Sequence, residues 1–184
     1  MPIDEALPFH PVHIAVLTIS DSHMKDTDSA GDCLAERIAA AGHRVAARTT
    51  VPNELHDIGQ RVRLWIMDKN IDVIISTGGT GLTVRDVTPE AMRSIWDKEI
   101  EGFGELFRAL AYRSIGTSTI QSRACAGVAR GTCIFALPGS MDAVQCAWDG
   151  ILKHQLDSRQ LPSNFIALMP RLTAQAQLVK QRPL

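Results

Sequence analysis

A short apolar strand that runs directly into a glycine-rich loop constrains this chain most strongly. Residues 73–75 are all β-branched, which predicts a buried strand over residues 71–77. Residues 78–81 include three glycines, which permit positive φ angles and let a ligand approach bare backbone N–H groups. Consecutive N–H groups of this kind can form a concave site for anions, phosphate above all. The glycines alone favour a simpler interpretation, a tight turn in which they serve only the backbone geometry.

Two charged residues after the loop favour a ligand site over a simple turn. Arg85 and Asp86 lie side by side, and Thr88-Pro89-Glu90 has the residues of a helix start. The loop has neither the lysine of the Walker motif nor the third glycine of the Rossmann motif. A strand, a glycine loop and a helix in this order place the loop where ligands of open α/β sheets usually bind.

The rest of the chain alternates strands and helices. Residues 12–20 and 44–51 are expected strands, and helices are expected over residues 30–41 and from 54 to about 69. Connections this short predict right-handed crossovers and a mostly parallel sheet. Further expected elements are a helix from 88 through 96, a helical pattern interrupted at 102–104, a strand over 133–137 and a helix over 141–156.

The chain is interpreted as one domain, residues 12–166, between an N-terminal arm, residues 1–11, and a C-terminal tail, residues 167–184. Periodicity weakens after Pro162, so the final polar, glutamine-rich stretch is expected to be irregular or disordered.

Composition argues against several classes of protein. The net charge of −1 gives no basic field for nucleic acid, and no apolar run is long enough to cross a membrane. Residues 1–11 lack the pattern of a signal peptide, so a cytoplasmic location is expected. The four cysteines form no Cys-x-x-Cys pair and the histidines are scattered, so no zinc site is expected.

Polar or glycine-rich residues follow three of the expected strands. These segments are Ser20-Asp21, residues 78–86 and residues 138–140, and the carboxyl ends of parallel strands meet at one edge of a sheet. The chemistry indicated is phosphate binding, with Arg85 or Arg123 as a charge-assisted partner. Asp86 suits either Mg²⁺, which bridges carboxylate and phosphate oxygens, or the cap of the next helix.

Several motifs resemble the signature of the molybdopterin-binding family of molybdenum cofactor synthesis. The resemblance covers roughly residues 12–166, and its B-type members match best. The motifs that carry it are Thr77-Gly78-Gly79-Thr80-Gly81, Arg85-Asp86-Val87-Thr88-Pro89-Glu90-Ala91, Glu101-Gly102-Phe103-Gly104-Glu105, Ile115-Gly116-Thr117-Ser118, Ser118-Thr119-Ile120-Gln121-Ser122-Arg123-Ala124, Leu137-Pro138-Gly139-Ser140 and Leu161-Pro162-Ser163-Asn164-Phe165.

The resemblance implies a three-layer αβα sandwich with a mostly parallel sheet, the molybdopterin-binding fold. It also implies a homo-oligomer, trimer or hexamer, that binds molybdopterin and transfers AMP from MgATP to its terminal phosphate. Asp86, as a tentative Mg²⁺ ligand, and Asn53 would be catalytic. The molybdopterin- or nucleotide-binding residues would be Ser20, Asp21, Gly78, Gly79, Thr80, Gly81, Arg85, Ser118, Ser122, Arg123, Pro138, Gly139 and Ser140.

One residue departs from the pattern of the family. Active relatives have an aspartate after the proline that begins the second helix, whereas Asn53 follows Pro52 here. Asparagine keeps an oxygen ligand but lacks the charge, which affects catalysis more than binding. Two alternatives therefore stand beside the adenylyltransferase: a non-catalytic molybdopterin-binding or carrier protein, and a different nucleotidyl- or phosphotransferase.

Overall fold

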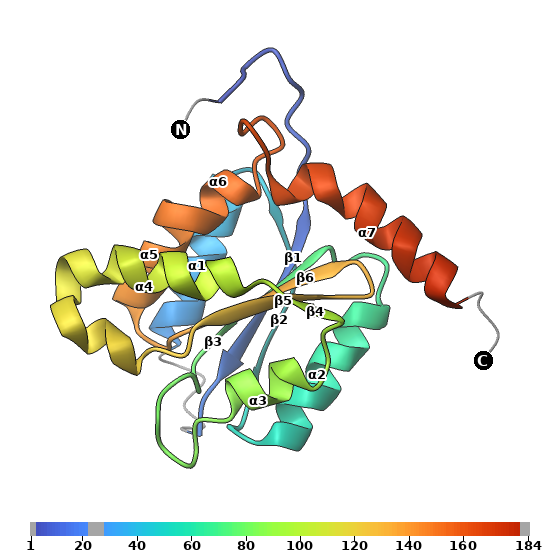
Figure 1. Cartoon of the computed structure of the whole chain (residues 1–184). Coiled ribbons are helices and arrows are strands. Elements are labelled where there is room, and N and C mark those ends of the chain that lie inside the picture. The colour runs from blue at the N-terminus through green and yellow to red at the C-terminus, as the bar shows by residue number, and fades with distance from the viewer. Residues whose placement is uncertain (1–2, 22–27, 181–184) are drawn as a thin grey trace.

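The computed structural model describes residues 3–21 and 28–180. Residues 1–2 and 181–184, the outer ends of the expected arm and tail, lie outside the described residues. The elements, labelled in Figure 1, are β1 His13–Ile19, α1 Ser29–Ala40, β2 Arg44–Val51, α2 Leu55–Met67, β3 Val73–Thr77, α3 Thr88–Arg93, β4 Lys98–Glu99, α4 Glu101–Ile115, the 3-10 helix η2 Gly116–Gln121, β5 Cys125–Ala129, β6 Thr132–Leu137, α5 Met141–Ala147, the π-helical turn η3 Trp148–Leu152, α6 Lys153–Gln155 and α7 Phe165–Lys180.

The described strands form one sheet in the order β2-β1-β3-β6-β5-β4. The four strands from β2 to β6 in that order are parallel, whereas β5 and β4 pair antiparallel with their neighbours. The central strands β1, β3 and β6 are buried along almost their whole length, as expected for strands covered on both faces. The expected mostly parallel sheet is confirmed.

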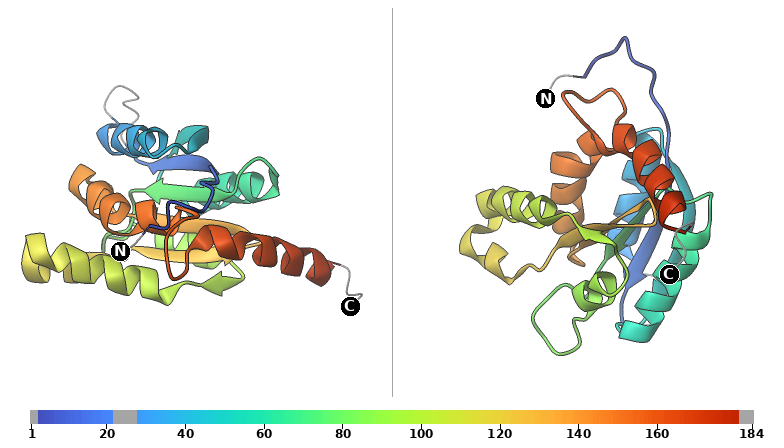
Figure 2. Two further views of the ribbon diagram at one scale, coloured as in Figure 1. Left: turned by 90° about the horizontal axis from the view of Figure 1, so that it is seen from above. Right: turned by 45° about the vertical axis from the view of Figure 1, so that its right-hand side comes forward.

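Helices cover both faces of the sheet and make three layers (Figures 1 and 2). On one face, Leu34 of α1, Phe107 of α4 and Trp148 of η3 belong to one buried cluster with side chains from the strands. On the other face, Ile58 of α2 and Met92 of α3 pack with the remaining strand side chains. The three-layer αβα sandwich implied by the resemblance is therefore confirmed.

The expected break at residues 102–104 is wrong, because α4 runs without interruption from Glu101 to Ile115. Gly104 has a packing role instead. A Cβ atom built on it would lie 2.6 Å from the carbonyl oxygen of Ala124, so the glycine lets α4 approach the chain just before β5.

The expectation of an irregular C-terminal tail is also wrong, since α7 extends through Lys180 with Pro170 inside it. Phe165, Ile166, Met169 and Leu172, spaced at helical intervals, pack against the core of the α4 face. The proline and the glutamines hide this stripe in the sequence. Figure 2 shows α7 continuing away from the sheet toward the C-terminus.

Candidate functional site

The site is built around residues 78–88, which join β3 to α3. Gly78 and Gly79 have φ angles of 106° and 64°, values that glycine adopts without strain. A Cβ atom on Gly78 would lie 2.2 Å from the carbonyl oxygen of Ile19, and one on Gly139 would lie 3.2 Å from the Cα atom of Gly78. The ends of β1, β3 and β6 therefore meet closely here, as expected for three strand ends that converge.

Donors from outside the turn hold the carbonyl oxygens of residues 78–81. Thr88 donates from its Oγ1 to the Gly78 oxygen (2.9 Å) and from its backbone nitrogen to the Gly79 oxygen (3.0 Å). Arg123 donates from its backbone nitrogen to the Thr80 oxygen (3.1 Å) and from Nε to the Gly81 oxygen (2.7 Å). The carbonyl groups, which would repel an anion, are thus engaged within the protein.

The N–H groups of the same segment behave differently. Within residues 3–21 and 28–180, no acceptor lies in hydrogen-bond geometry to the N–H groups of Gly79 or Thr80. Thr80 is buried and Gly79 is half-buried, and both line the cavity described below. Because backbone donors with little exposure to water are nearly always paired, two unpaired N–H groups in a row leave room for a ligand acceptor. Consecutive N–H groups without a protein acceptor are what the predicted anion site requires.

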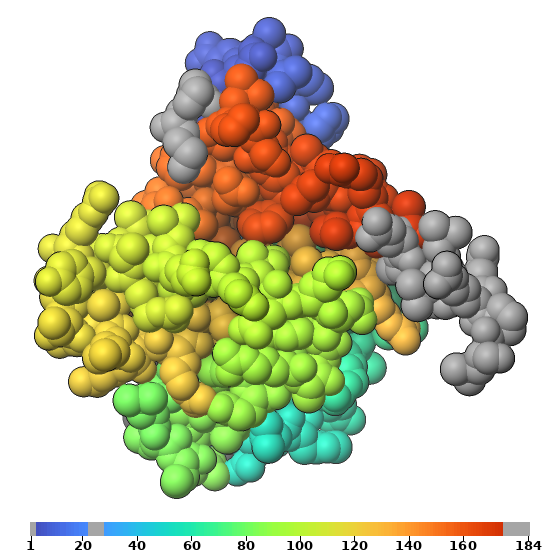
Figure 3. Space-filling model, in the orientation of Figure 1, coloured from blue at the N-terminus to red at the C-terminus, as the bar shows by residue number. Residues whose placement is uncertain are grey.

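A cavity of about 610 Å³ opens beside these glycines. The loop lines one side, the Pro138–Ser140 segment after β6 lines a second, and α4 with η2 lines a third. In Figure 3 the loop (green) and the end of α4 with η2 (yellow) lie on the same face of the molecule. The lining residues are Ile19, Gly78, Gly79, Thr80, Gly81, Asp86, Phe107, Ala111, Ser114, Ile115, Ser118, Thr119, Gln121, Ser122, Pro138, Gly139, Ser140, Asp142, Ala143 and Cys146.

Asp86 lines the cavity and does not cap α3. Its Oδ2 atom accepts bonds from the backbone nitrogen (2.9 Å) and the hydroxyl (2.7 Å) of Thr83, whereas α3 begins after Val87 without a side-chain cap. The Thr83 hydroxyl, aided by N–H groups of Thr83 and Gly81, holds the pKa of Asp86 below its usual value against a weaker effect of burial. The side chain is therefore an ionised carboxylate at neutral pH.

A resident metal site is not formed by the described side chains, which contain no cluster of three or more His, Cys, Asp or Glu suited to a metal. Mg²⁺ is commonly held by one or two carboxylates together with phosphate oxygens of a substrate. Both Thr83 bonds fall on Oδ2 of Asp86, so this carboxylate retains acceptor capacity on Oδ1. One such carboxylate beside a phosphate site fits a Mg²⁺ ion that arrives with its nucleotide.

Arg85 lies outside the cavity. Its guanidinium donates to both carboxylate oxygens of Asp21 (3.2 and 3.0 Å) and to Glu54 (2.7 Å). The half-exposed ion pairs raise the pKa of Arg85, Glu54 contributing first. Arg85 and Asp21, both predicted to bind the ligand, pair with each other and do not line the cavity.

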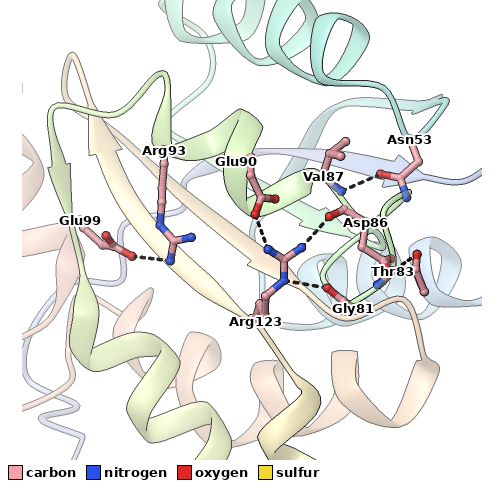
Figure 4. Close-up of polar contacts among 9 residues, drawn as sticks. All are labelled: Asn53, Gly81, Thr83, Asp86, Val87, Glu90, Arg93, Glu99 and Arg123. Atoms are coloured by element: carbon pink, nitrogen blue, oxygen red, sulfur yellow. Dashed lines mark hydrogen bonds and ion pairs between the residues drawn. The ribbon is translucent and has the colours of Figure 1, made fainter.

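Asn53 lies behind the loop, also outside the cavity lining. Its backbone nitrogen donates to Asp21 (2.9 Å), and its side-chain oxygen accepts a weak bond from the backbone nitrogen of Val87 (3.4 Å). Figure 4 shows Asn53 on the opposite side of Asp86 from Arg123. Ser20 continues from β1 with a backbone bond to Val51 (3.0 Å) and is likewise absent from the lining.

The cavity also uses residues that sequence reasoning did not select. Phe107, Ala111 and Ser114 of α4 face it, together with Asp142 and Cys146 of α5. A spacing of three or four residues within α4 and within α5 puts each set on one helical face. That spacing was visible in the sequence, but which face would look toward the glycine loop depends on the tertiary packing.

This fold and this site define a class: an αβα domain with a glycine-rich loop and a neighbouring cavity at the carboxyl ends of its strands. Residues 15–158 match the family model described as “Probable molybdopterin binding domain”. The chain belongs to this family.

Relatives agree with the assignment. Molybdenum cofactor biosynthesis protein B of Escherichia coli (strain K12) is 46% identical over 157 residues, 85% of this chain and 92% of the relative. The protein of the same name from Staphylococcus aureus (strain COL) is 45% identical over 149 residues, 79% of this chain and 88% of the relative.

Solved structures match as well. A crystal structure of a molybdenum cofactor biosynthesis protein B superimposes with a TM-score of 0.77 at 34% identity and covers 92% of this chain and 98% of that one. The tungsten cofactor synthesizing protein MoaB of Pyrococcus furiosus has a TM-score of 0.69 at 35% identity, covering 78% and 92%. Among the described residues, no helix has the length and apolar character needed to span a membrane.

Proposed function

We propose that this protein acts in molybdenum cofactor biosynthesis by binding molybdopterin in the cavity and transferring AMP to it from MgATP. An oxygen of the terminal phosphate attacks the α-phosphorus of ATP, the bond from that phosphorus to the β-phosphate oxygen breaks, and pyrophosphate leaves. The products are adenylyl-molybdopterin and pyrophosphate. The observation that carries the proposal is the pair of unpaired N–H groups, on Gly79 and Thr80, in a loop whose Asp86 is ionised.

The chemistry needs few special groups. The second pKa of a phosphate monoester is about 6, so molybdopterin reaches the site already ionised and no strong general base is required. Catalysis then rests on positioning the two phosphates and neutralising their charge. A cavity of about 610 Å³ also falls in the range of ordinary small-molecule sites.

Each part of the site has a place in this scheme. The N–H groups of the loop would bind the phosphate of molybdopterin, and Ser118, Ser122 and Ser140 offer hydroxyls along the cavity. Asp86 would hold the Mg²⁺ that accompanies ATP, and the ion would offset the negative charge of the phosphate chain. We further propose, on the resemblance to the family, that the protein acts as a homo-oligomer, trimer or hexamer, in the cytoplasm.

A direct assay tests the proposal. Purified protein is mixed with molybdopterin and MgATP, and pyrophosphate release and adenylyl-molybdopterin are both measured. Formation of the two products in equal amounts supports the transferase. Binding of molybdopterin without pyrophosphate release contradicts it.

Binding without transfer would favour a second function, in which the protein binds or carries molybdopterin without catalysis. The observation that favours this function is the asparagine at position 53. Family members that transfer AMP are expected to have a carboxylate at this position, and here an uncharged amide bonds only weakly to Val87. A carrier would keep the cavity and the glycine loop and lose the second negative charge of the site.

A further inference from the structure

The side chain of Arg123 was expected to bind a ligand phosphate, but each of its three guanidinium nitrogens donates a hydrogen bond within the protein. Nε donates to the backbone carbonyl oxygen of Gly81 (2.7 Å), and Nη2 donates to the backbone carbonyl oxygen of Asp86 (2.5 Å). Nη1 donates to the side-chain carboxylate of Glu90. Figure 4 shows the guanidinium reaching all three acceptors at once. The side chain is 27% exposed and is absent from the cavity lining.

The two carbonyl groups that Arg123 holds are the ends of one turn. Gly81 begins it and Asp86 closes it, and the bonds from Thr83 to the Asp86 carboxylate lie between them. A planar guanidinium presents its donors at fixed angles, so it can set the separation of two carbonyl groups in a way that a single ammonium cannot.

Holding a carbonyl group also orients the next N–H group, because the two point in opposite directions across a planar trans peptide. Because the backbone carbonyl oxygen of Asp86 points toward Arg123, the N–H group of Val87 points away from Arg123, toward the side-chain oxygen of Asn53. Arg123 and Asn53 thus form hydrogen bonds with the backbone at Asp86–Val87 from two sides, as Figure 4 shows.

We infer that Arg123 is a positioning residue: it holds residues 81–86 in the conformation that presents the Asp86 carboxylate to the cavity, with Glu90 anchoring its guanidinium. The inference rests on the proposed function for its catalytic consequence, since Asp86 is the carboxylate assigned to Mg²⁺. That Arg123 holds the conformation of residues 81–86 is a claim about the protein alone, and it does not depend on a bound ligand.

The chain offers a matched control in Arg93. Arg93 is the last residue of α3, and its guanidinium pairs with the carboxylate of Glu99 (3.2 Å). Figure 4 shows the Arg93–Glu99 pair separate from the Arg123 contacts. Replacing Arg93 removes an arginine and an ion pair without touching residues 81–86.

The test compares Arg123→Gln, Arg123→Lys and Arg93→Gln with the parent protein, first without any ligand. NMR-detected hydrogen exchange is measured at the amides of Thr83, Asp86 and Val87, each of which donates a bond in or beside the turn. Exchange at least tenfold faster in Arg123→Gln, intermediate in Arg123→Lys and unchanged in Arg93→Gln supports the inference. Parent-like exchange in Arg123→Gln overturns it. If Arg123→Gln does not fold, the same measurement on Arg123→Lys decides.

A kinetic measurement then separates positioning from general stability. With molybdopterin and MgATP, Arg123→Gln should lower kcat at least tenfold and raise the KM for MgATP, while the Kd for molybdopterin changes less than threefold.

A rescue experiment uses the alanine variants. Guanidinium ion added below denaturing concentrations should restore part of kcat to Arg123→Ala and should leave kcat of Arg93→Ala unchanged. A parent-like kcat in Arg123→Gln contradicts the catalytic consequence. If the parent itself does not turn over, the proposed function fails, and the exchange experiment still decides the inference.

Discussion

The side-chain oxygen of Asn53 lies 3.4 Å from the backbone nitrogen of Val87 and accepts its hydrogen bond from behind the glycine loop. Asn53 is therefore adjacent to the chain that carries Asp86, although it does not line the cavity. This contact makes position 53 the place where the transferase and the carrier can be separated by one substitution.

Asn53→Asp should raise the rate of AMP transfer. The aspartate keeps an oxygen for the Val87 N–H and adds a negative charge near the proposed Mg²⁺, which prefers carboxylate to amide oxygen. A charge contact of this kind in a water-poor site is worth roughly 2–4 kcal/mol, or about 30- to 1000-fold in rate. Steady-state rates at saturating MgATP and molybdopterin measure it. If the variant still forms no product and still binds molybdopterin, the carrier is the better account.

Asp86→Asn should reduce transfer by roughly 100-fold or more and leave the fold intact. The amide oxygen can still accept both Thr83 bonds, so the turn is kept, but the charge assigned to Mg²⁺ is lost. Asp142→Asn is the control, because Asp142 is a second carboxylate that lines the same cavity. Turnover at the parent rate in Asp86→Asn would refute the metal-holding role.

Gly78→Ala should destabilise the protein by about 2–4 kcal/mol. The alanine would have to adopt a φ of 106° with its Cβ 2.2 Å from the Ile19 oxygen, so backbone strain and overpacking add. Gly102→Ala, in α4 with no heavy atom within 4 Å of its Cβ, should stabilise by about 0.5 kcal/mol. Urea unfolding curves of both variants check the contrast. Equal stabilities would show that the strand ends do not meet as closely as described.

Folding stability should fall as the pH drops from about 7 to 5, with His43 contributing to the fall. Burial between the rings of Phe9 and Trp148 lowers the pKa of His43, and Asp157 opposes this only in part. The histidine pKa of the unfolded state is about 6.5, so below this pH the unfolded state binds more protons than the folded state. The free energy of unfolding is therefore kept above this pH and falls below it.

His43→Gln should flatten this pH dependence, whereas substitution of the exposed His10 should not. Unfolding free energies measured at intervals from pH 5 to pH 8 test it. An unchanged slope in His43→Gln would exclude His43 as its source.

Four of the six strands in the described sheet were predictable: apolar runs mark β1, β3 and β6, and alternating apolar and polar residues mark β2. The two-residue β4 and the small-residue strand β5 have no comparable signal and were not expected. The β-branched run 73–75 and the glycines after it identify both β3 and the edge where ligands bind. Helix α4 was harder, since Gly104 looks like a break in the sequence and serves instead to admit the Ala124 carbonyl.

The site was predictable in its backbone and less so in its side chains. Residues 78–81 and 138–140 line the cavity as expected, because the strand ends alone determine their place. Arg85 and Arg123 were expected at the ligand, yet both bind protein groups. Their partners Glu54, Glu90 and the Gly81 and Asp86 carbonyl groups come together only through tertiary folding, which no local pattern encodes.

The fate of the α-phosphorus of ATP tests the central claim most directly. Purified protein is incubated with molybdopterin and MgATP in two parallel reactions, labelled with ³²P at the α- or the γ-phosphate, and the pterin product is isolated. The account predicts that the α-label appears on molybdopterin and the γ-label leaves in pyrophosphate. A γ-label on molybdopterin would identify a phosphotransferase, and the absence of either label on bound molybdopterin would contradict transfer altogether.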